Sequence, residues 1–163
     1  MVEAAIAWLL NFLAVSQVGL PAVFLIAFIS ATLVPLGSEP VVFAMVKANP
    51  DLFALTILVA TVGNTLGGVV NYVMGFGAEK AFHKERASRW FGWLERYGAK
   101  TMLLSWLPGI GDPLCLLAGW LKLPFWPCVA YMALGKCLRY TCMTLLLLSV
   151  PNGFWHQLAS WLG

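Results

Sequence analysis

The feature that most restricts the fold is a long apolar run from Leu52 to Phe76 that contains no Asp, Glu, Lys, Arg or His. A helix of this length rises about 37 Å at about 1.5 Å per residue, which is enough to cross a hydrocarbon core of about 30 Å. A second run of similar length extends from Phe125 to Val150, although it contains Lys136 and Arg139. Both runs are predicted to be full transmembrane helices.

The composition also indicates a membrane protein. Of the 163 residues, 61% are hydrophobic and only 10% are charged, and the mean hydropathy is +0.83. A water-soluble domain of this composition would have too few polar residues to cover its surface. We therefore expect one integral membrane domain over residues 1–163, with a first half at 19–76, a basic cytoplasmic interfacial segment at 77–100 and a second half at 101–150.

Two other apolar regions are interrupted by proline-rich breaks, Pro-Leu-Gly-Ser-Glu-Pro at 35–40 and Pro-Gly-Ile-Gly-Asp-Pro at 108–113. Proline removes backbone donors and glycine loosens the chain, so neither break should continue a helix. The arms at 101–107 and 114–121 each rise only about 10 to 12 Å as helix. We therefore predict re-entrant hairpins, which enter and leave the membrane on one face. The hairpin-breaking residues are Pro35, Pro40, Pro108, Gly109, Gly111 and Pro113.

For the first break, the alternative is a single proline-kinked helix from Leu20 to Val46. The positive-inside rule compares the two topologies. With two hairpins, the cytoplasmic side holds Lys122 together with the six cations of residues 80–100, and the outer side holds Lys47. Kinked spans would move Lys122 to the outer side. The charge distribution therefore favours hairpins, with both termini outside.

The ends of the chain are predicted to form interfacial amphipathic helices. Residues 4–15 and 154–162 are too short to span and contain tryptophans, which prefer the headgroup level. The basic segment between Lys80 and Lys100 is interleaved with aromatic residues, and beside spanning helices we interpret it as a belt that faces anionic lipid, not nucleic acid. No cysteine or histidine pattern indicates a metal or another cofactor.

The breaks at 35–40 and 108–113 share one pattern: a proline, three intervening positions, an acid and a second proline. Each break is followed by a long apolar run. One spanning helix separates the two hairpins, so they would enter from opposite faces, as in the inverted repeats of secondary transporters. The predicted fold is thus an all-α membrane protein with two opposed re-entrant helical hairpins and two full transmembrane helices in an inverted repeat. Such a short pattern can also match by chance.

Four ionisable residues are predicted to lie at membrane depth: Glu39, Asp112, Lys136 and Arg139. Lys136 and Arg139 share one helical face near the middle of their span, where each charge costs about 2.5 to 3.5 kcal/mol. We interpret them as a cation pair that binds an anionic headgroup, with the two acids exchanging a proton. Asn64 is a further candidate headgroup ligand. The alternatives are a structural ion-pair cluster and acids that cap the half-helices following them.

Three segments resemble the DedA membrane family, also called the VTT or SNARE-associated family, and in particular its short YqaA-type branch. They are FISATLVPLGSE at 28–39, the glycine-rich residues 63–77 and SWLPGIGDPLCLLAG at 105–119. Ser30 stands where the long branch has its first acid, and Ser105 and Gly111 stand where it has arginines, whereas Asp112-Pro113 fits the short branch. The resemblance implies a multi-pass protein of the bacterial inner membrane that moves lipids such as undecaprenyl phosphate with the proton gradient.

The sequence therefore predicts a transporter, not an enzyme: a proton-linked flippase of an anionic, phosphate-bearing lipid, without a cofactor or a nucleic-acid partner. Its predicted partners are membrane lipids and protons, and assembly into a homo-oligomer is left open. One alternative is a small-ion or proton antiporter that uses the same four charged groups. Another is a non-transporting scaffold whose basic segment recruits partners.

Overall fold

The computed structural model describes residues 16–32, 37–78, 94, 96–107 and 110–149. Its principal elements, in chain order, are α2 (Ser16–Thr32), α3 (Glu39–Ala48), η1 (Pro50–Leu52), α4 (Phe53–Ala78), η2 (Gly98–Trp106), α6 (Gly111–Trp120) and α7 (Phe125–Ser149), where η denotes a 3₁₀ helix. Every one of these elements is helical. The predicted all-α class is therefore confirmed.

Two helices are much longer than the others and match the two long apolar runs. α4 has 26 residues and α7 has 25, so each rises about 37 to 39 Å. Within the described ranges, one helical stretch, Pro50–Gly77, is both long and apolar enough to cross a membrane, with a mean hydropathy of 1.8. α7 is less apolar because it carries Lys136 and Arg139.

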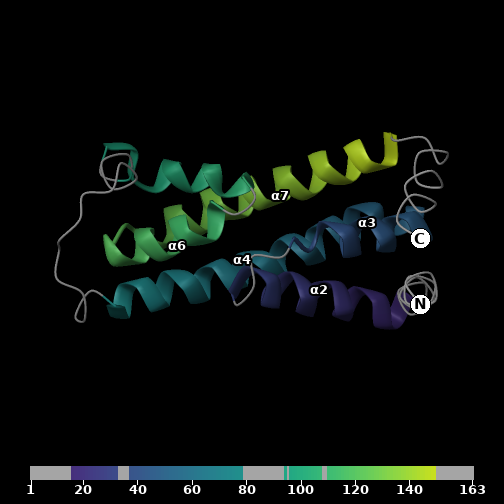
Figure 1. Ribbon diagram of the computed structural model, residues 1–163, viewed down its shortest axis with the longest axis horizontal. Helices are drawn as coiled ribbons and strands as arrows, with labels where there is room; N and C mark the ends of the chain where they lie inside the picture. The colour runs from purple at the N-terminus through teal and green to yellow at the C-terminus, as the bar shows by residue number, and fades with distance from the viewer. Residues whose placement is uncertain (1–15, 33–36, 79–93, 95, 108–109, 150–163) are drawn as a thin grey trace, which may run out of the picture.

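The shorter helices occupy opposite ends of the molecule (Figure 1). α2 runs from one end to the middle, and α3 runs from the middle back to that same end. η2 and α6 repeat this arrangement at the other end. α4 and α7 run the length of the molecule in opposite directions. The starts of α3 and α6 therefore both lie near the middle of the long helices.

Glycines let α2 pack closely against α4. A Cβ atom added at Gly63 would lie 2.6 Å from the carbonyl oxygen of Phe24, and one at Gly67 would lie 2.6 Å from the Cβ of Ala31. Both distances are shorter than real Cβ contacts, so only glycine allows this approach of the two backbones. The glycines at these positions of the first long run therefore serve close helix contact.

Two asparagines of α4 bond to backbone carbonyls of α2. The side-chain amide of Asn64 donates to Ala27 at 2.9 Å, and that of Asn71 donates to Ala31 at 2.7 Å. Ala31 is in the last turn of α2, where helix carbonyls have no N–H donor within the helix. Asn71 satisfies one of these carbonyls, which helps α2 to end in the interior of the protein.

The second half is also joined through glycines. Gly75 of α4 meets the backbone of Leu116 on α6, and Gly119 of α6 meets the backbone of Tyr72 on α4. A Cβ added at Gly135 of α7 would lie 2.6 Å from the carbonyl oxygen of Leu103 in η2. These contacts hold α6 against α4 and η2 against α7.

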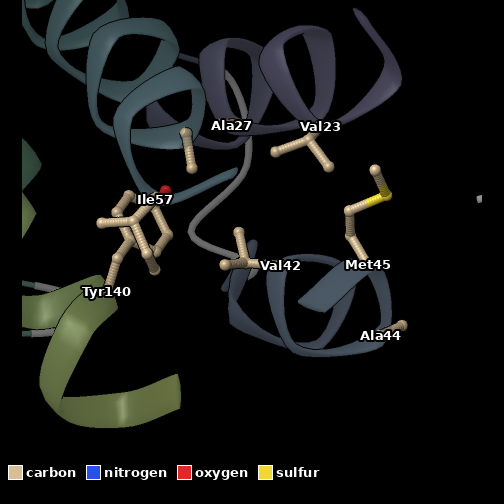
Figure 2. Packing of buried hydrophobic residues seen from close by; sticks show 8 residues of the cluster. Val23, Ala27, Val42, Ala44, Met45, Ile57 and Tyr140 are labelled. Atoms are coloured by element: carbon tan, nitrogen blue, oxygen red, sulfur yellow. The ribbon is translucent and has the colours of Figure 1, made fainter. Parts of the chain in front are cut away.

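Two hydrophobic cores lie along α7. The first joins α2, α3, α4 and α7, and Figure 2 shows Ile57 and Tyr140 beside each other within it. The second joins α4, η2, α6 and α7 and includes Met132 of α7. Lys136 and Arg139 therefore occupy the stretch of α7 between its contributions to the two cores, Met132 and Tyr140. The first core consists of Val23, Ala27, Val42, Ala44, Met45, Ile57, Ala60 and Tyr140.

The outward faces of the long helices are strongly apolar. Leu58 and Val73 of α4 and Leu134 and Leu146 of α7 are each more than half exposed, and Trp126 at the start of α7 is 78% exposed. Soluble monomers rarely expose contiguous apolar surface of this kind. These faces suit contact with lipid, and Trp126 suits the interfacial belt at one end.

The helices that follow the proline-rich breaks begin earlier than predicted. α3 begins at Glu39 and α6 at Gly111, so Pro40, Gly111 and Pro113 lie in the first turns of helices and not in the breaks. Proline fits there because the first N–H groups of a helix have no partner within the helix.

Several predicted features lie outside the described residues: Pro35, Pro108, Gly109, the terminal segments 4–15 and 154–162, and most of the basic segment 80–100.

Candidate functional site

The candidate site lies where the starts of α3 and α6 meet the middle of α7. Glu39 is the first residue of α3, and Asp112 is the second residue of α6. A helix start carries free N–H groups and the positive end of the helix dipole, so an acid is stabilised there. Both acids therefore lie at a helix start that stabilises their negative charge, and Lys136 and Arg139 of α7 contact them.

Arg139 and Glu39 form the first ion pair of the site. The Nε and Nη2 atoms of Arg139 both contact Oε1 of Glu39. The side chains are 9% and 15% exposed, so the pair is largely removed from solvent. An Arg that uses two nitrogens on one carboxylate is held in both position and orientation.

A hydroxyl pair adjoins this ion pair. Ser38 precedes Glu39, Tyr140 follows Arg139, and the two hydroxyl groups share a short hydrogen bond. Ser38 and Tyr140 are both buried. Two consecutive residues at the start of α3 therefore bond to two consecutive residues of α7.

Lys136 and Asp112 form the second ion pair, and Lys136 has an additional partner. Its Nζ donates to the backbone carbonyl of Asn64 at 2.6 Å and to Oδ1 of Asp112 at 3.3 Å. Lys136 is 1% exposed, whereas the side chain of Asp112 is 27% exposed. The ammonium is thus buried against α4, and its carboxylate partner lies on the more open side.

Gly68 gives Lys136 access to the carbonyl of Asn64. Gly68 lies one helical turn after Asn64, so it stands beside that carbonyl on the surface of α4. A Cβ added at Gly68 would lie 3.1 Å from Nζ of Lys136 and 2.5 Å from Sδ of Met132. A side chain at position 68 would therefore displace the sulfur of Met132 and crowd the ammonium of Lys136.

The same face of α4 carries two further polar groups. Thr61, Thr65 and Gly68 follow one another at helical spacing and so share one face. The buried hydroxyls of Thr61 and Thr65 have no hydrogen-bond partner among the described residues. This face of α4 therefore carries two hydroxyl groups that are not hydrogen-bonded within the described part of the chain.

The structure brings together all four ionisable residues that the sequence singled out, as two ion pairs one helical turn apart on α7. Asn64 joins them, although differently from the prediction: its side chain bonds to α2, and its backbone carbonyl contacts Lys136. Ser38, Gly68 and Tyr140 were not predicted from the sequence. The only sequence signal for Ser38 and Tyr140 is that each is adjacent to a predicted charged residue.

The described part of the chain contains neither a metal-binding cluster nor a disulfide. No group of three or more His, Cys, Asp or Glu side chains there is placed to hold a metal ion. The cysteines at positions 115, 128, 137 and 142 are free thiols, and two of them are buried among apolar side chains.

The long helices α4 and α7 have apolar outer faces, and the helices together enclose two buried ion pairs. These features define a helical integral membrane protein. The chain matches the VTT domain family over residues 34–148. It therefore belongs to this family, which is the DedA family of inner-membrane proteins, and the resemblance noted from the sequence is confirmed.

The similarity to known proteins extends over most of the chain. Inner membrane protein YqaA of Escherichia coli strain K12 is 46% identical over 121 residues, which cover 72% of this chain and 82% of the relative. A protein of Haemophilus influenzae is 42% identical over 137 residues, covering 78% and 85% of the two chains. The membrane protein YbfM of Bacillus subtilis is 25% identical over 139 residues, covering 76% and 85%. No solved structure matches the chain. The names of these relatives indicate no catalytic family.

Proposed function

We propose that this protein is a proton-linked translocase of anionic, phosphate-bearing lipids, of which undecaprenyl phosphate is an example. The observation that carries the proposal is the pair of buried cations on α7, each matched to an acid at the interior start of a short helix. Phosphate groups bind to cationic side chains and to helix N-termini, and both are present at this site. An acid that gains a proton releases its cation for the phosphate, which would link the two movements.

We propose further that α2 with α3, and η2 with α6, are re-entrant hairpins in the membrane. α3 and α6 have 10 residues each and rise about 15 Å. η2 has 9 residues and rises about 18 Å at about 2.0 Å per residue. These lengths fall well short of a hydrocarbon core of about 30 Å, and each pair of helices returns to the end of the molecule from which it came (Figure 1).

Two features support an inverted repeat. Gly63 and Gly135, which hold equivalent positions in the two long runs, each approach a carbonyl of a short helix so closely that an added Cβ would lie 2.6 Å from that oxygen. In addition, α2 and η2 each pack on the long helix of their own half, whereas α3 packs on α7 and α6 packs on α4. A twofold axis in the membrane plane would produce this exchange of partners.

The site is suited to a headgroup at mid-depth with its acyl chains outside. The acids are more exposed than the cations, so a phosphate would reach the cations from the side on which the acids lie. The apolar outer faces of α4 and α7 would accompany the acyl chains through the hydrocarbon core. The unused hydroxyls of Thr61 and Thr65 would bond to water or to phosphate oxygens.

The test uses the full chain reconstituted in phosphatidylcholine vesicles that contain a fluorescent phosphatidic acid, with quencher added outside. Lys136→Gln should lower translocation to the rate of protein-free vesicles. Lys122→Gln, which removes a cation at the exposed turn between α6 and α7, is the matched control and should retain the wild-type rate. Full activity of Lys136→Gln would refute the proposal. Movement of protons or small ions in vesicles without phosphatidic acid would instead identify an antiporter.

A further inference from the structure

The two ion pairs of the site differ in how firmly the protein holds them, and this difference deepens the proposed function, on which the following inference rests. Glu39, at the start of α3, is contacted by two nitrogens of Arg139, and the Ser38–Tyr140 hydrogen bond adjoins that contact. At the start of α6, Asp112 contacts Lys136 through one oxygen at 3.3 Å. One acid is fastened by several polar bonds, the other by a single longer one.

The repeat pattern explains why the second acid lacks the extra fastening. Ser38-Glu39-Pro40 aligns with Gly111-Asp112-Pro113 when the two breaks are matched, so Gly111 stands where the first half has Ser38. Gly111 has no hydroxyl, and an added Cβ there would lie 2.7 Å from the carbonyl oxygen of Ser105. The packing of α6 against η2 thus excludes a side chain that could fasten α6 to α7.

Lys136 does not depend on Asp112 to stay in place. Its shorter bond, at 2.6 Å, goes to the backbone carbonyl of Asn64, which belongs to the middle of α4 and has a fixed position. If Asp112 moved away, Lys136 would keep this partner and would present its remaining N–H groups to the space that the carboxylate had left. Because Asp112 is the most exposed of the four charged side chains, that space is also the most accessible.

We infer that Asp112 and Lys136 are an exchangeable pair, in which a phosphate anion displaces the Asp112 carboxylate from Lys136. The Glu39–Arg139 ion pair, by contrast, is a fixed pair that holds α3 on α7. The Ser38–Tyr140 hydrogen bond reinforces it. Lys136 is then the residue that binds the phosphate, Asp112 competes with it, and Arg139 is a positioning residue. The anion is a phosphate group, carried either by a lipid or by free phosphate.

The competition predicts different effects on anion affinity for two isosteric substitutions, Asp112→Asn and Glu39→Gln. The full chain is held in nonionic detergent, and its thermal unfolding is titrated with phosphatidic acid in the micelles or with inorganic phosphate in the buffer. Asp112→Asn removes the competing charge and should tighten the apparent affinity for the anion about tenfold. Glu39→Gln should leave the affinity within about twofold of wild type while lowering the Tm more than Asp112→Asn does.

Several outcomes would overturn the inference: an affinity in Asp112→Asn that is unchanged or weaker, an equal tightening in Glu39→Gln, no response of either chain to either anion, or an Asp112→Asn chain that does not fold. A Glu39→Gln chain that does not fold would support the fixed pair, and Ser38→Ala then serves as the affinity control. Tightening with phosphatidic acid alone indicates a lipid headgroup, and tightening with inorganic phosphate alone indicates the free anion.

Anion affinity is measured without transport, so binding at Lys136 and lipid translocation are tested separately. If Asp112→Asn tightens anion binding but wild-type vesicles translocate no lipid, the proposed function is wrong and the exchangeable pair stands. If the vesicles translocate lipid but Asp112→Asn does not tighten binding, the exchangeable pair is wrong and the proposed function stands.

Discussion

The hydroxyl groups of Ser38 and Tyr140 share a hydrogen bond although the two residues are 102 positions apart in the chain. Ser38 immediately precedes α3, and Tyr140 lies in the second half of α7. This bond and the neighbouring Glu39–Arg139 ion pair connect the first half of the protein to the last long helix. The stability of the whole bundle should therefore depend on these two contacts.

Tyr140→Phe removes one hydroxyl of this pair and leaves the Ser38 hydroxyl buried without its partner. We expect a loss of about 1 to 2 kcal/mol in the free energy of unfolding, because a buried polar group without a hydrogen bond loses its interaction with water and gains nothing in return. Denaturant titration of the protein in micelles measures this loss. Tyr131→Phe, elsewhere on α7, is the control, and equal losses in the two variants would contradict the prediction.

Gly68→Ala tests the access of Lys136 to the carbonyl of Asn64. The added methyl group would lie 2.5 Å from Sδ of Met132 and 3.1 Å from Nζ of Lys136, so the methionine must move and the lysine must shift slightly. We expect a destabilisation of about 1 to 3 kcal/mol, measured by denaturant titration, together with loss of lipid translocation in the vesicle assay. Gly77→Ala is the matched control on the same helix.

An added Cβ at Gly77 meets no atom within 4 Å, and alanine favours the helix by about 0.5 to 1 kcal/mol. Gly77→Ala should therefore be neutral or stabilising and should retain transport. If Gly68→Ala behaved in the same way, the crowding at Lys136 would have no functional importance.

Asn71→Ala leaves the carbonyl of Ala31, in the last turn of α2, without its amide donor. Because this carbonyl lies inside the protein, the loss should amount to about 1 to 2 kcal/mol of unfolding free energy. Val70→Ala, which truncates an exposed neighbour, should cost less than half as much. Hydrogen exchange should report faster exchange in the last turn of α2 for Asn71→Ala only, and unchanged exchange there would contradict the capping role.

The membrane topology is tested by thiol labelling of single cysteines at positions 47 and 122 in a chain whose four native cysteines are replaced. With re-entrant hairpins, Lys122→Cys should react from the cytoplasmic face and Lys47→Cys from the outer face of sealed vesicles. Two proline-kinked spans would place both cysteines on one common face. Labelling of both from the same face would therefore exclude the hairpins.

The sequence alone determined the lengths of α4 and α7, the two interruptions between apolar segments, and the presence of two cations at the middle of a long helix. These are local properties: the length of an apolar run, the missing N–H of proline and the position of Lys136 within its run do not depend on distant residues. The family followed from the same local motifs.

Only the tertiary structure decided which acid meets which cation. Lys136 and Arg139 share one face of α7, so their spacing cannot show that Arg139 meets Glu39 and Lys136 meets Asp112. The answer depends on where the starts of α3 and α6 lie relative to α7, which only the packing of the helices against one another sets. The contact between Lys136 and the carbonyl of Asn64 had no sequence signal, since a backbone oxygen has the same chemistry in every residue and only packing selects the one that is used.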